Sequence, residues 1–201
     1  MIDAAVRKSY GGFSLDAAMS DEGFICLAGR NGSGKTTLLR IVGGLAKPDG
    51  GYVKVGGRDV TGMAVDDRGV VMVTPGSSIP SLTVDDHLRW GARLKGIEIG
   101  TERLQEVKRA LGIDFQGRAD RLSLGMRERV SLSTALLSKP AAILVDEAFS
   151  NLHEREGFVT AYRELAAEAG IDVVYSTQDG SDGRLAQHLY WLDEGRATRR
   201  F

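Results

Sequence analysis

Gly29-Arg30-Asn31-Gly32-Ser33-Gly34-Lys35-Thr36-Thr37 is the stretch from which this chain is best interpreted. It fits the pattern G-x-x-x-x-G-K-[ST], the phosphate-binding P-loop. Glycines at this spacing let backbone amides come close to an anion and point toward it. The Lys35 side chain can then reach the β- and γ-phosphates of a nucleotide, and the Thr36 hydroxyl can coordinate Mg²⁺.

The sequence on either side of the loop supports the same interpretation. Phe24–Ala28 is a short apolar run that predicts a buried strand, and Thr37–Val42 begins a helical pattern. That helix would present its N-terminus to a phosphate group. An ordinary glycine-rich turn would explain the glycines, but not the order of strand, loop, Lys-Thr pair and helix.

Composition limits the classes of protein that fit. The chain has 201 residues, of which 42% are hydrophobic and 26% charged, as expected of one domain with a substantial core. A net charge of −1 gives no electrostatic reason to expect nucleic-acid binding. We interpret the cluster of Arg118, Arg121, Arg127 and Arg129 as a solvated or interface patch. The single cysteine, Cys26, excludes an intramolecular disulfide and is expected in the core.

No membrane segment is expected. No apolar run approaches the length of a membrane span. The start, Met1–Ala4, lacks the charged region and the apolar core of a signal peptide. A membrane role would therefore have to come through a partner chain.

The expected secondary structure changes twice along the chain. Residues 1–75 contain strands, turns and the P-loop helix, residues 76–139 favour helices, and residues 140–201 return to α/β alternation. Thr83 is the expected N-cap of the first helix in the middle stretch. Before Gly170, a helix is expected whose apolar face carries Phe158, Ala161, Tyr162, Leu165 and Ala169.

An aromatic residue lies in a turn ahead of the P-loop. Tyr10 is followed by Gly11-Gly12, in a turn between two expected strands. Its ring is either a packing group or a surface on which a nucleotide base stacks. The local sequence favours neither interpretation over the other.

A second candidate element of the site is a pair of carboxylates. Ala141–Val145 is a continuous apolar run, as expected of a parallel strand covered on both faces, and Asp146-Glu147 follows it directly. Open α/β sheets bind ligands at the carboxyl ends of their strands. Asp146 is therefore the candidate ligand for Mg²⁺, and Glu147 the candidate general base for an attacking water.

These motifs together resemble the nucleotide-binding subunit of an ABC (ATP-binding cassette) transporter. The resemblance covers nearly the whole chain and rests on motifs in a fixed order. They are Tyr10, the P-loop, Ile79–Val84, Leu122-Ser123-Leu124-Gly125-Met126 at the family signature, Ile143–Glu147 at Walker B, Phe149–Leu152 at the D-loop and Thr177-Gln178-Asp179 at the switch. Tyr10 matches the aromatic residue that stacks on adenine.

The resemblance implies a fold. It is an α/β, P-loop NTPase fold with a mostly parallel, RecA-like sheet, an N-terminal antiparallel β subdomain and an inserted α-helical subdomain. Residues 1–201 form a single ATP-binding domain, in which residues 1–75 and 140–201 make the core with its β subdomain. Residues 76–139 make the helical subdomain that carries the signature.

The resemblance also implies a mechanism and a set of ligand-binding residues. Two cassettes meet head to tail, and Ser123 and Gly125 of one contact the ATP that the other binds. ATP and Mg²⁺ are the implied cofactors. The expected ATP-binding residues are Tyr10, Asn31, Gly32, Ser33, Gly34, Lys35, Thr36, Thr37, Ser123 and Gly125. The expected metal-binding residues are Thr36, Asp146 and Thr74, and the expected catalytic residues are Glu147, Lys35, Gln178 and Thr74.

Three polar positions depart from the usual pattern of the family. Thr74 stands where a Gln usually contacts Mg²⁺ and water, Gln178 replaces the switch His, and His153 replaces the D-loop Asp. A glutamine side chain donates a hydrogen bond to phosphate, but it cannot become a cation or shuttle a proton. We therefore expect ATP and Mg²⁺ binding to survive and hydrolysis to be slow.

The expected function is an ATPase subunit of a membrane transporter. Its expected partners are a membrane-spanning permease and a second ATP-binding subunit, in a homodimer or a heterodimer. It would lie in the cytoplasm on the inner face of the cell membrane. The alternatives are a soluble ATPase of this class for assembly or repair, a largely non-hydrolytic ATP-binding switch, and the degenerate half of an asymmetric heterodimer.

Overall fold

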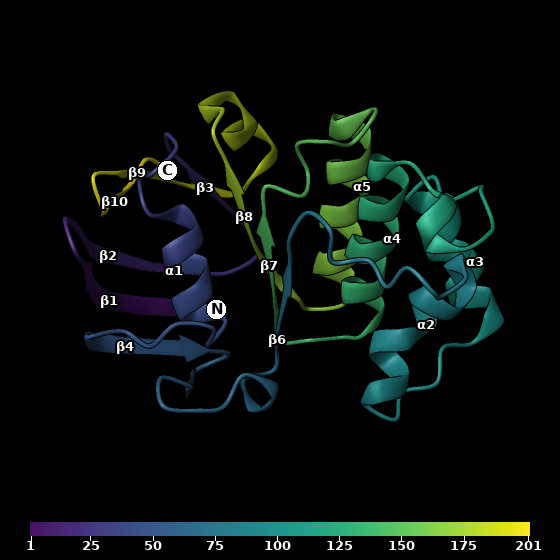
Figure 1. The fold of residues 1–201 in the computed structure, drawn as a ribbon, viewed down its shortest axis with the longest axis horizontal. Coiled ribbons are helices and arrows are strands. Elements are labelled where there is room, and N and C mark those ends of the chain that lie inside the picture. The colour runs from purple at the N-terminus through teal and green to yellow at the C-terminus, as the bar shows by residue number, and fades with distance from the viewer.

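Two β-sheets organise residues 1–201, all of which are described by the computed structural model (Figure 1). The smaller sheet has the strand order β2-β1-β4-β5, and the larger sheet has the order β10-β9-β3-β8-β7-β6. The strands are β1 (Ile2–Tyr10), β2 (Phe13–Asp21), β3 (Phe24–Ala28), β4 (Gly50–Val55), β5 (Arg58–Asp59), β6 (Val70–Val73), β7 (Ala142–Asp146), β8 (Asp172–Thr177), β9 (His188–Asp193) and β10 (Arg196–Arg199).

The larger sheet is parallel except for its last strand. Strands β9, β3, β8, β7 and β6 pair in parallel, and β10 is antiparallel to β9. Every residue of β3, β7 and β8 is buried, which explains why these strands are continuous apolar runs in the sequence. The predicted P-loop NTPase fold, with a mostly parallel sheet, an antiparallel β portion and helices, is confirmed.

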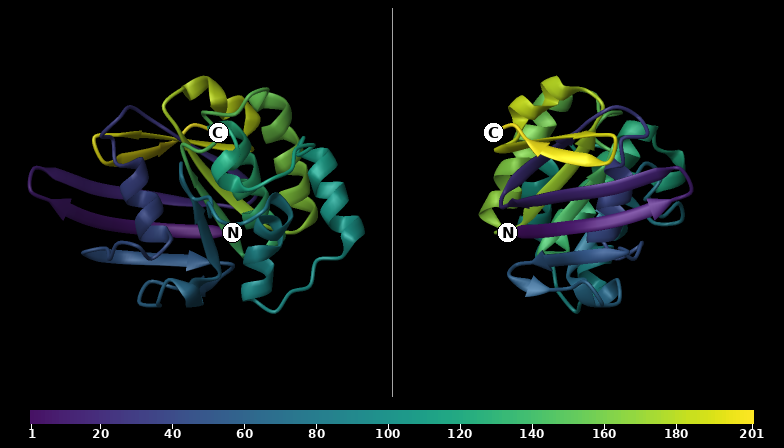
Figure 2. Two further views of the ribbon diagram at one scale, coloured as in Figure 1. Left: turned by 45° about the vertical axis from the view of Figure 1, so that its right-hand side comes forward. Right: turned by 90° about the vertical axis from the view of Figure 1, so that its left-hand side faces the viewer.

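The smaller sheet is antiparallel and packs its apolar face on helix α1 (Lys35–Val42). Its two long strands alternate between buried and more exposed residues, with Ile2, Ala4 and Val6 buried in β1. The same core cluster contains residues of α1 and of the large sheet. Figure 2 shows β1 and β2 crossing in front of the large sheet in its right-hand view.

The remaining helices lie toward the other end of the molecule (Figure 1). They are α2 (Val84–Leu94), α3 (Thr101–Ala110), α4 (Leu124–Leu137) and α5 (Arg155–Glu168). Helices α2 and α4 pack closely at Gly91, where a Cβ atom would lie 2.9 Å from the Cβ of Ser138. No helix has both the length and the apolar character needed to span a membrane. The assignment of residues 76–139 to a separate helical subdomain stays a prediction.

Most of the expected local details are confirmed, and one is wrong. The Thr83 hydroxyl accepts a hydrogen bond from the Asp86 amide and caps α2, and Cys26 is buried. Burial raises the pKa of the Cys26 thiol to about 12, as expected of an inert core cysteine. Ala169, in contrast, is exposed, because α5 ends at Glu168 and the chain turns at Gly170 with φ 66°.

A buried arginine fixes the end of the P-loop helix. Arg68 is 5% exposed, and its guanidinium donates hydrogen bonds to four backbone carbonyls. Two of them belong to Ile41 and Val42, at 3.0 and 3.1 Å, in the last turn of α1. The cation therefore satisfies carbonyls that have no partner within the helix and complements the negative end of the helix dipole.

We predict that Arg68→Met destabilises the fold. The substitution keeps much of the apolar stem but removes the donor to four backbone carbonyls, of which that of Ile41 keeps the Gly44 amide at 3.1 Å, and the expected cost is ~3 kcal/mol. Urea-induced unfolding measures this change. Arg40→Met, on the exposed face of the same helix, is the matched control and should change stability by less than ~0.5 kcal/mol. Equal losses in the two variants would contradict the role given to Arg68.

Candidate functional site

The carboxyl ends of three parallel strands meet at one edge of the large sheet. Ala28 at the end of β3 pairs with Thr177 of β8, and Ser176 of β8 pairs with Asp146 of β7. The P-loop begins at this edge, where the Gly29 amide donates to the Thr177 carbonyl at 3.2 Å. The pairing of the strands therefore brings the loop, the acidic pair and the switch segment to one edge.

The P-loop has the backbone conformation that its glycines predict. Gly32 and Gly34 have φ values of 78° and 107°, in the left-handed region that favours glycine. Gly34 is the N-cap of α1, which has no side-chain cap, so the first amides of the helix are left for another acceptor. A pocket of about 180 Å³ lies here, lined by Phe13, Asn31, Gly32, Gly34, Lys35, Thr36, Thr37 and Glu147.

Lys35 places a positive charge at this pocket. Its ammonium group donates hydrogen bonds to the carbonyls of Gly29 at 2.6 Å and Arg30 at 3.0 Å. Burial lowers the pKa of Lys35, while the carboxylates of Glu147 and Asp146 act to raise it. Lys35 is therefore held by carbonyls of the loop itself, in the lining of the pocket.

Ser176 joins the two acidic residues. Its hydroxyl donates to Asp146 Oδ1 at 2.7 Å and accepts the Glu147 amide at 3.0 Å. Glu147 has a φ of 58°, unusual for a residue with a side chain, and it is the only acidic side chain in the pocket lining. Sequence reasoning missed Ser176, because nothing near it in the chain indicates that it pairs with Asp146.

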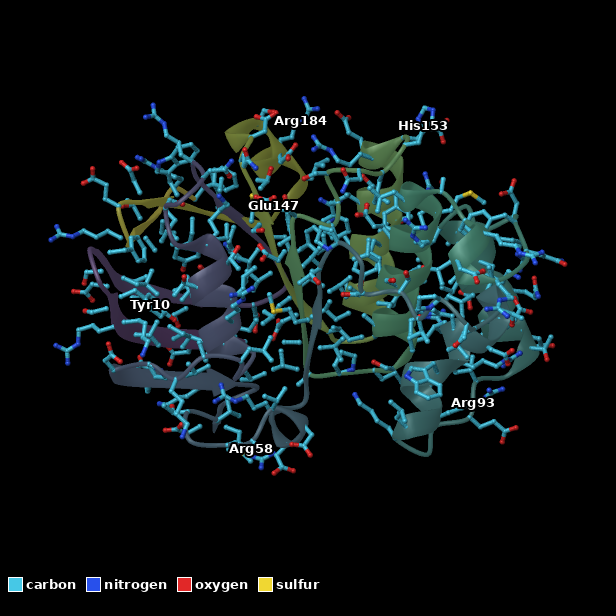
Figure 3. The ribbon with its side chains drawn as sticks, in the orientation of Figure 1. Tyr10, Arg58, Arg93, Glu147, His153 and Arg184 are labelled. Carbon is cyan, nitrogen blue, oxygen red and sulfur yellow. The ribbon has the colours of Figure 1, made fainter.

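The switch residue contacts the candidate base. Gln178 lies directly after β8, and its Nε2 donates to Glu147 Oε1 at 3.1 Å. Gln178 is exposed and Glu147, which is labelled in Figure 3, is half-buried. The structure therefore brings Glu147 and Gln178 together.

Thr74 follows β6, the neighbour of β7 at the outer side of the sheet. Its amide donates to the Ser77 Oγ at 2.9 Å, and the two hydroxyl oxygens are 3.1 Å apart. Thr74 thus lies at the same edge as Asp146, and its hydroxyl is engaged by Ser77. Whether it ligates a metal stays a prediction.

Two aromatic residues lie at the hairpin beside the loop. Tyr10 is 47% exposed, with the Lys8 ammonium 5.4 Å from the centre of its ring. Phe13, its partner across the hairpin, lines the pocket, and a Cβ atom on Gly34 would lie 2.8 Å from the Phe13 ring. Tyr10 is therefore free to contact a ligand. Phe13, which sequence reasoning missed, is the aromatic residue that contacts the loop.

The signature residues lie outside the lining of the pocket that contains Lys35. The Ser123 hydroxyl caps α4 by accepting the Met126 amide at 3.3 Å, and neither Ser123 nor Gly125 lines the pocket of Lys35. Gly125 packs on the D-loop, where a Cβ atom would be 3.0 Å from the Asn151 carbonyl oxygen. His153, labelled in Figure 3, lies far from Glu147, and its carbonyl accepts a hydrogen bond from Arg129.

Helix α4 holds the D-loop through a buried carboxyl group. Glu128 is 2% exposed, and its Oε1 accepts the Asn151 side-chain amide at 2.9 Å. Burial raises the pKa of Glu128. The signature helix and the D-loop are therefore joined by buried polar contacts as well as by close packing.

Comparisons with known proteins agree with this geometry. Residues 14–150 match the protein family described as ABC transporter. The Fe(3+) ions import ATP-binding protein FbpC 1 of Haemophilus influenzae is 35% identical over 196 residues, which cover 93% of this chain and 60% of that protein. The sn-glycerol-3-phosphate import ATP-binding protein UgpC of Salmonella typhi is 37% identical over 210 residues, covering 97% of this chain and 58% of that protein.

A third relative is matched over more of its own length. The probable sulfate/thiosulfate import ATP-binding protein CysA of Chlorella vulgaris is 31% identical over 203 residues, covering 95% of this chain and 86% of that protein. In contrast, the chain spans only 60% of FbpC 1 and 58% of UgpC.

Solved structures give the same result. The ATP-binding cassette MJ0796, in a dimeric post-hydrolysis state bound to ADP and Pi, has a TM-score of 0.82 and 25% identity, covering 99% of this chain and 97% of that one. A second dimeric structure of MJ0796, described as a bacterial ABC transporter cassette, has a TM-score of 0.81 and 26% identity. Since the motifs, the fold, the family match and the relatives agree over most of its length, this chain belongs to the ABC transporter family.

Proposed function

We propose that this chain is the ATP-binding subunit of an ABC transporter, that it hydrolyses ATP slowly, and that it drives a membrane-spanning permease. The observation that carries the proposal is the pocket in which the P-loop, Lys35 and Glu147 face the same space. The names of the three relatives support it, because each is called an import ATP-binding protein.

The residues of the pocket fit ATP with Mg²⁺. Amides from Asn31 to Thr37 would bind the phosphates, and Tyr10 would stack on the base. No group of three or more His, Cys, Asp and Glu side chains could hold a metal alone. This suits Mg²⁺, which is usually bound by one or two carboxylates together with phosphates and waters. Asp146, the Thr36 hydroxyl and Thr74 would hold it, and the bound ion would neutralise charge on the phosphate oxygens.

Glu147 is the proposed general base, and Gln178 positions it. A carboxylate within reach of the γ-phosphate can take a proton from the attacking water. Gln178 holds that carboxylate by a hydrogen bond, but it cannot carry a proton away. Losing one preorganised contact to the reacting phosphate costs roughly 10²–10³ in rate, so turnover is expected to be slow but measurable.

A second ATP-binding subunit would complete the site. Ser123 and Gly125 lie at the N-terminus of α4, away from the pocket of Lys35 in their own chain. A helix N-terminus binds anions, so these residues fit the γ-phosphate held by a second subunit. The partner is either a second copy or a related chain. In a heterodimer, this chain would contribute the slower of two sites.

An apolar groove offers a surface for the permease. A cavity of about 320 Å³ lies between β6, α2 and α4, with Val71, Ile79 and His87 in its lining. Burial lowers the pKa of His87, so this histidine carries no charge at neutral pH. Trp90 and Leu94, which also line it, are 40% and 71% exposed. Exposed apolar groups around a groove favour protein association, which would hold the chain against the inner face of the membrane.

We predict that Glu147→Gln retains ATP binding and loses hydrolysis. Removing the base should lower the rate by ~10² or more, without changing the contacts of the P-loop with phosphate. Lys35→Ala should weaken both binding and hydrolysis, because it removes the cation at the phosphates. Binding of fluorescent ATP and release of phosphate are measured side by side.

The same measurements separate the competing functions. Phosphate release by the wild-type protein that equals the Lys35→Ala background, alone and with its partners, would favour the non-hydrolytic switch. The observation that makes this switch the second candidate is that the residue bonded to Glu147 is Gln178, which cannot carry a proton away.

We predict that Leu94→Asp removes the permease from the complex. The change puts a charge at the exposed apolar rim of the groove, and docking of an apolar partner surface there would have to remove that carboxylate from water. The tagged chain is purified from detergent extracts of its native membranes, and co-purifying multi-span proteins are measured. Leu45→Asp, at an apolar position that is 57% exposed and outside the groove lining, is the control. If Leu94→Asp retains the membrane protein as well as the control does, the groove is not the docking site.

A further inference from the structure

A buried carboxylate lies directly behind the switch residue and has no role in the proposed chemistry. Asp182 is 5% exposed and belongs to the short 3-10 helix Gly180–Leu185, four positions after Gln178. Burying a carboxylate is costly unless it is paired and hydrogen-bonded. The partners of Asp182 therefore indicate what it stabilises.

Asp182 connects three segments of the site. Its Oδ2 accepts the Thr177 hydroxyl at 2.6 Å, and its Oδ1 forms an ion pair with Arg155 in the first turn of α5. Its backbone carbonyl accepts the Tyr175 hydroxyl at 2.7 Å. One residue thus joins the end of β8 to the helix that follows the D-loop.

These contacts fix the backbone on both sides of Gln178. Thr177, the residue before Gln178, donates its hydroxyl to Asp182, and the same oxygen accepts the Asp179 amide at 3.1 Å. The Asp179 carboxylate in turn accepts the Ser181 amide at 2.8 Å. The segment from 177 to 182 is therefore a closed hydrogen-bonded turn from which only the Gln178 side chain reaches Glu147.

We propose that Asp182, charged and paired with Arg155, is a positioning residue that orients Gln178 toward Glu147. The inference rests on the proposed function, because it assigns Gln178 a part in hydrolysis. The Thr177 hydroxyl has one O–H, which it donates to the Asp182 carboxylate. This hydrogen bond fixes the direction of the hydroxyl, so its oxygen is oriented to accept the Asp179 amide. An asparagine at this position has one acceptor oxygen in place of two, so it cannot accept from both Thr177 and Arg155, and the turn is held less firmly.

The chain contains a matched control for this ion pair. Arg184 and Glu156 form a second ion pair between the same two elements, but both side chains are 61% exposed. Arg184 is labelled at the outer face of the turn in Figure 3. An exposed pair contributes little to stability. Breaking it tests whether any link between the turn and α5 has the same effect.

The test is a double-mutant cycle in single-turnover ATP hydrolysis, with enzyme in excess over ATP. Asp182→Asn should lower the rate by about 10- to 100-fold, since a misplacement of about 1 Å has an effect of this size. In the Gln178→Ala background the same change should have an effect of less than twofold. Glu156→Gln should change the rate by less than twofold in both backgrounds. Hydrogen exchange of the Asp179 amide, measured without ATP, should be faster in Asp182→Asn and unchanged in Glu156→Gln.

Each other outcome overturns a defined part of the argument. Equal losses from Asp182→Asn in both backgrounds, or unchanged exchange at Asp179, would assign Asp182 a merely structural role and refute the inference alone. If Gln178→Ala leaves hydrolysis unchanged, the role proposed for Gln178 is wrong and the inference falls with it. A wild-type protein without hydrolysis above the Lys35→Ala level overturns both.

Discussion

In the large sheet, Ala28 of β3 lies beside Thr177 of β8, and Ser176 of β8 lies beside Asp146 of β7. Backbone hydrogen bonds hold these strands together, and the packing of side chains that are buried on both faces fixes the register. A slip by one residue would turn every side chain to the opposite face of the sheet. The P-loop, the acidic pair and the switch segment are close together only because the register holds.

The charges of the site depend on the same frame. Lys35 is 5% exposed, and its ammonium group is bound by the carbonyls of Gly29 and Arg30. Because both carbonyls belong to the loop, the cation stabilises the loop before any anion arrives. Under the proposed function, a bound phosphate would pair with the Lys35 ammonium group and would also accept hydrogen bonds from the amides of the loop. Little rearrangement is then needed, which is the advantage of a preorganised site.

The sequence predicts those parts of the site that are contiguous in the chain. The P-loop conformation follows from glycine spacing, and the position of Asp146 follows from the apolar run before it. Ser176 and Phe13 could not be found in this way, since their roles arise from strand pairing and packing between distant segments. Arg68 was missed for a similar reason: it caps a helix that ends far from it in the sequence. Local patterns predicted most of the elements, but the order of strands within each sheet came only from the structure.

The exchange of a switch histidine for Gln178 is more than the loss of a titratable group. A glutamine amide has two N–H bonds on one nitrogen. One of them is directed to Glu147 Oε1, so the second is free for a phosphate oxygen on the other side. A neutral imidazole has one N–H and cannot donate to both partners at once. Gln178 can therefore bridge the base and the γ-phosphate in a single protonation state. Under the proposed function, the substitution would keep a neutral donor to the γ-phosphate but lose the proton transfer and the charged contact of an imidazolium, so it would slow the chemical step more than it weakens ATP binding.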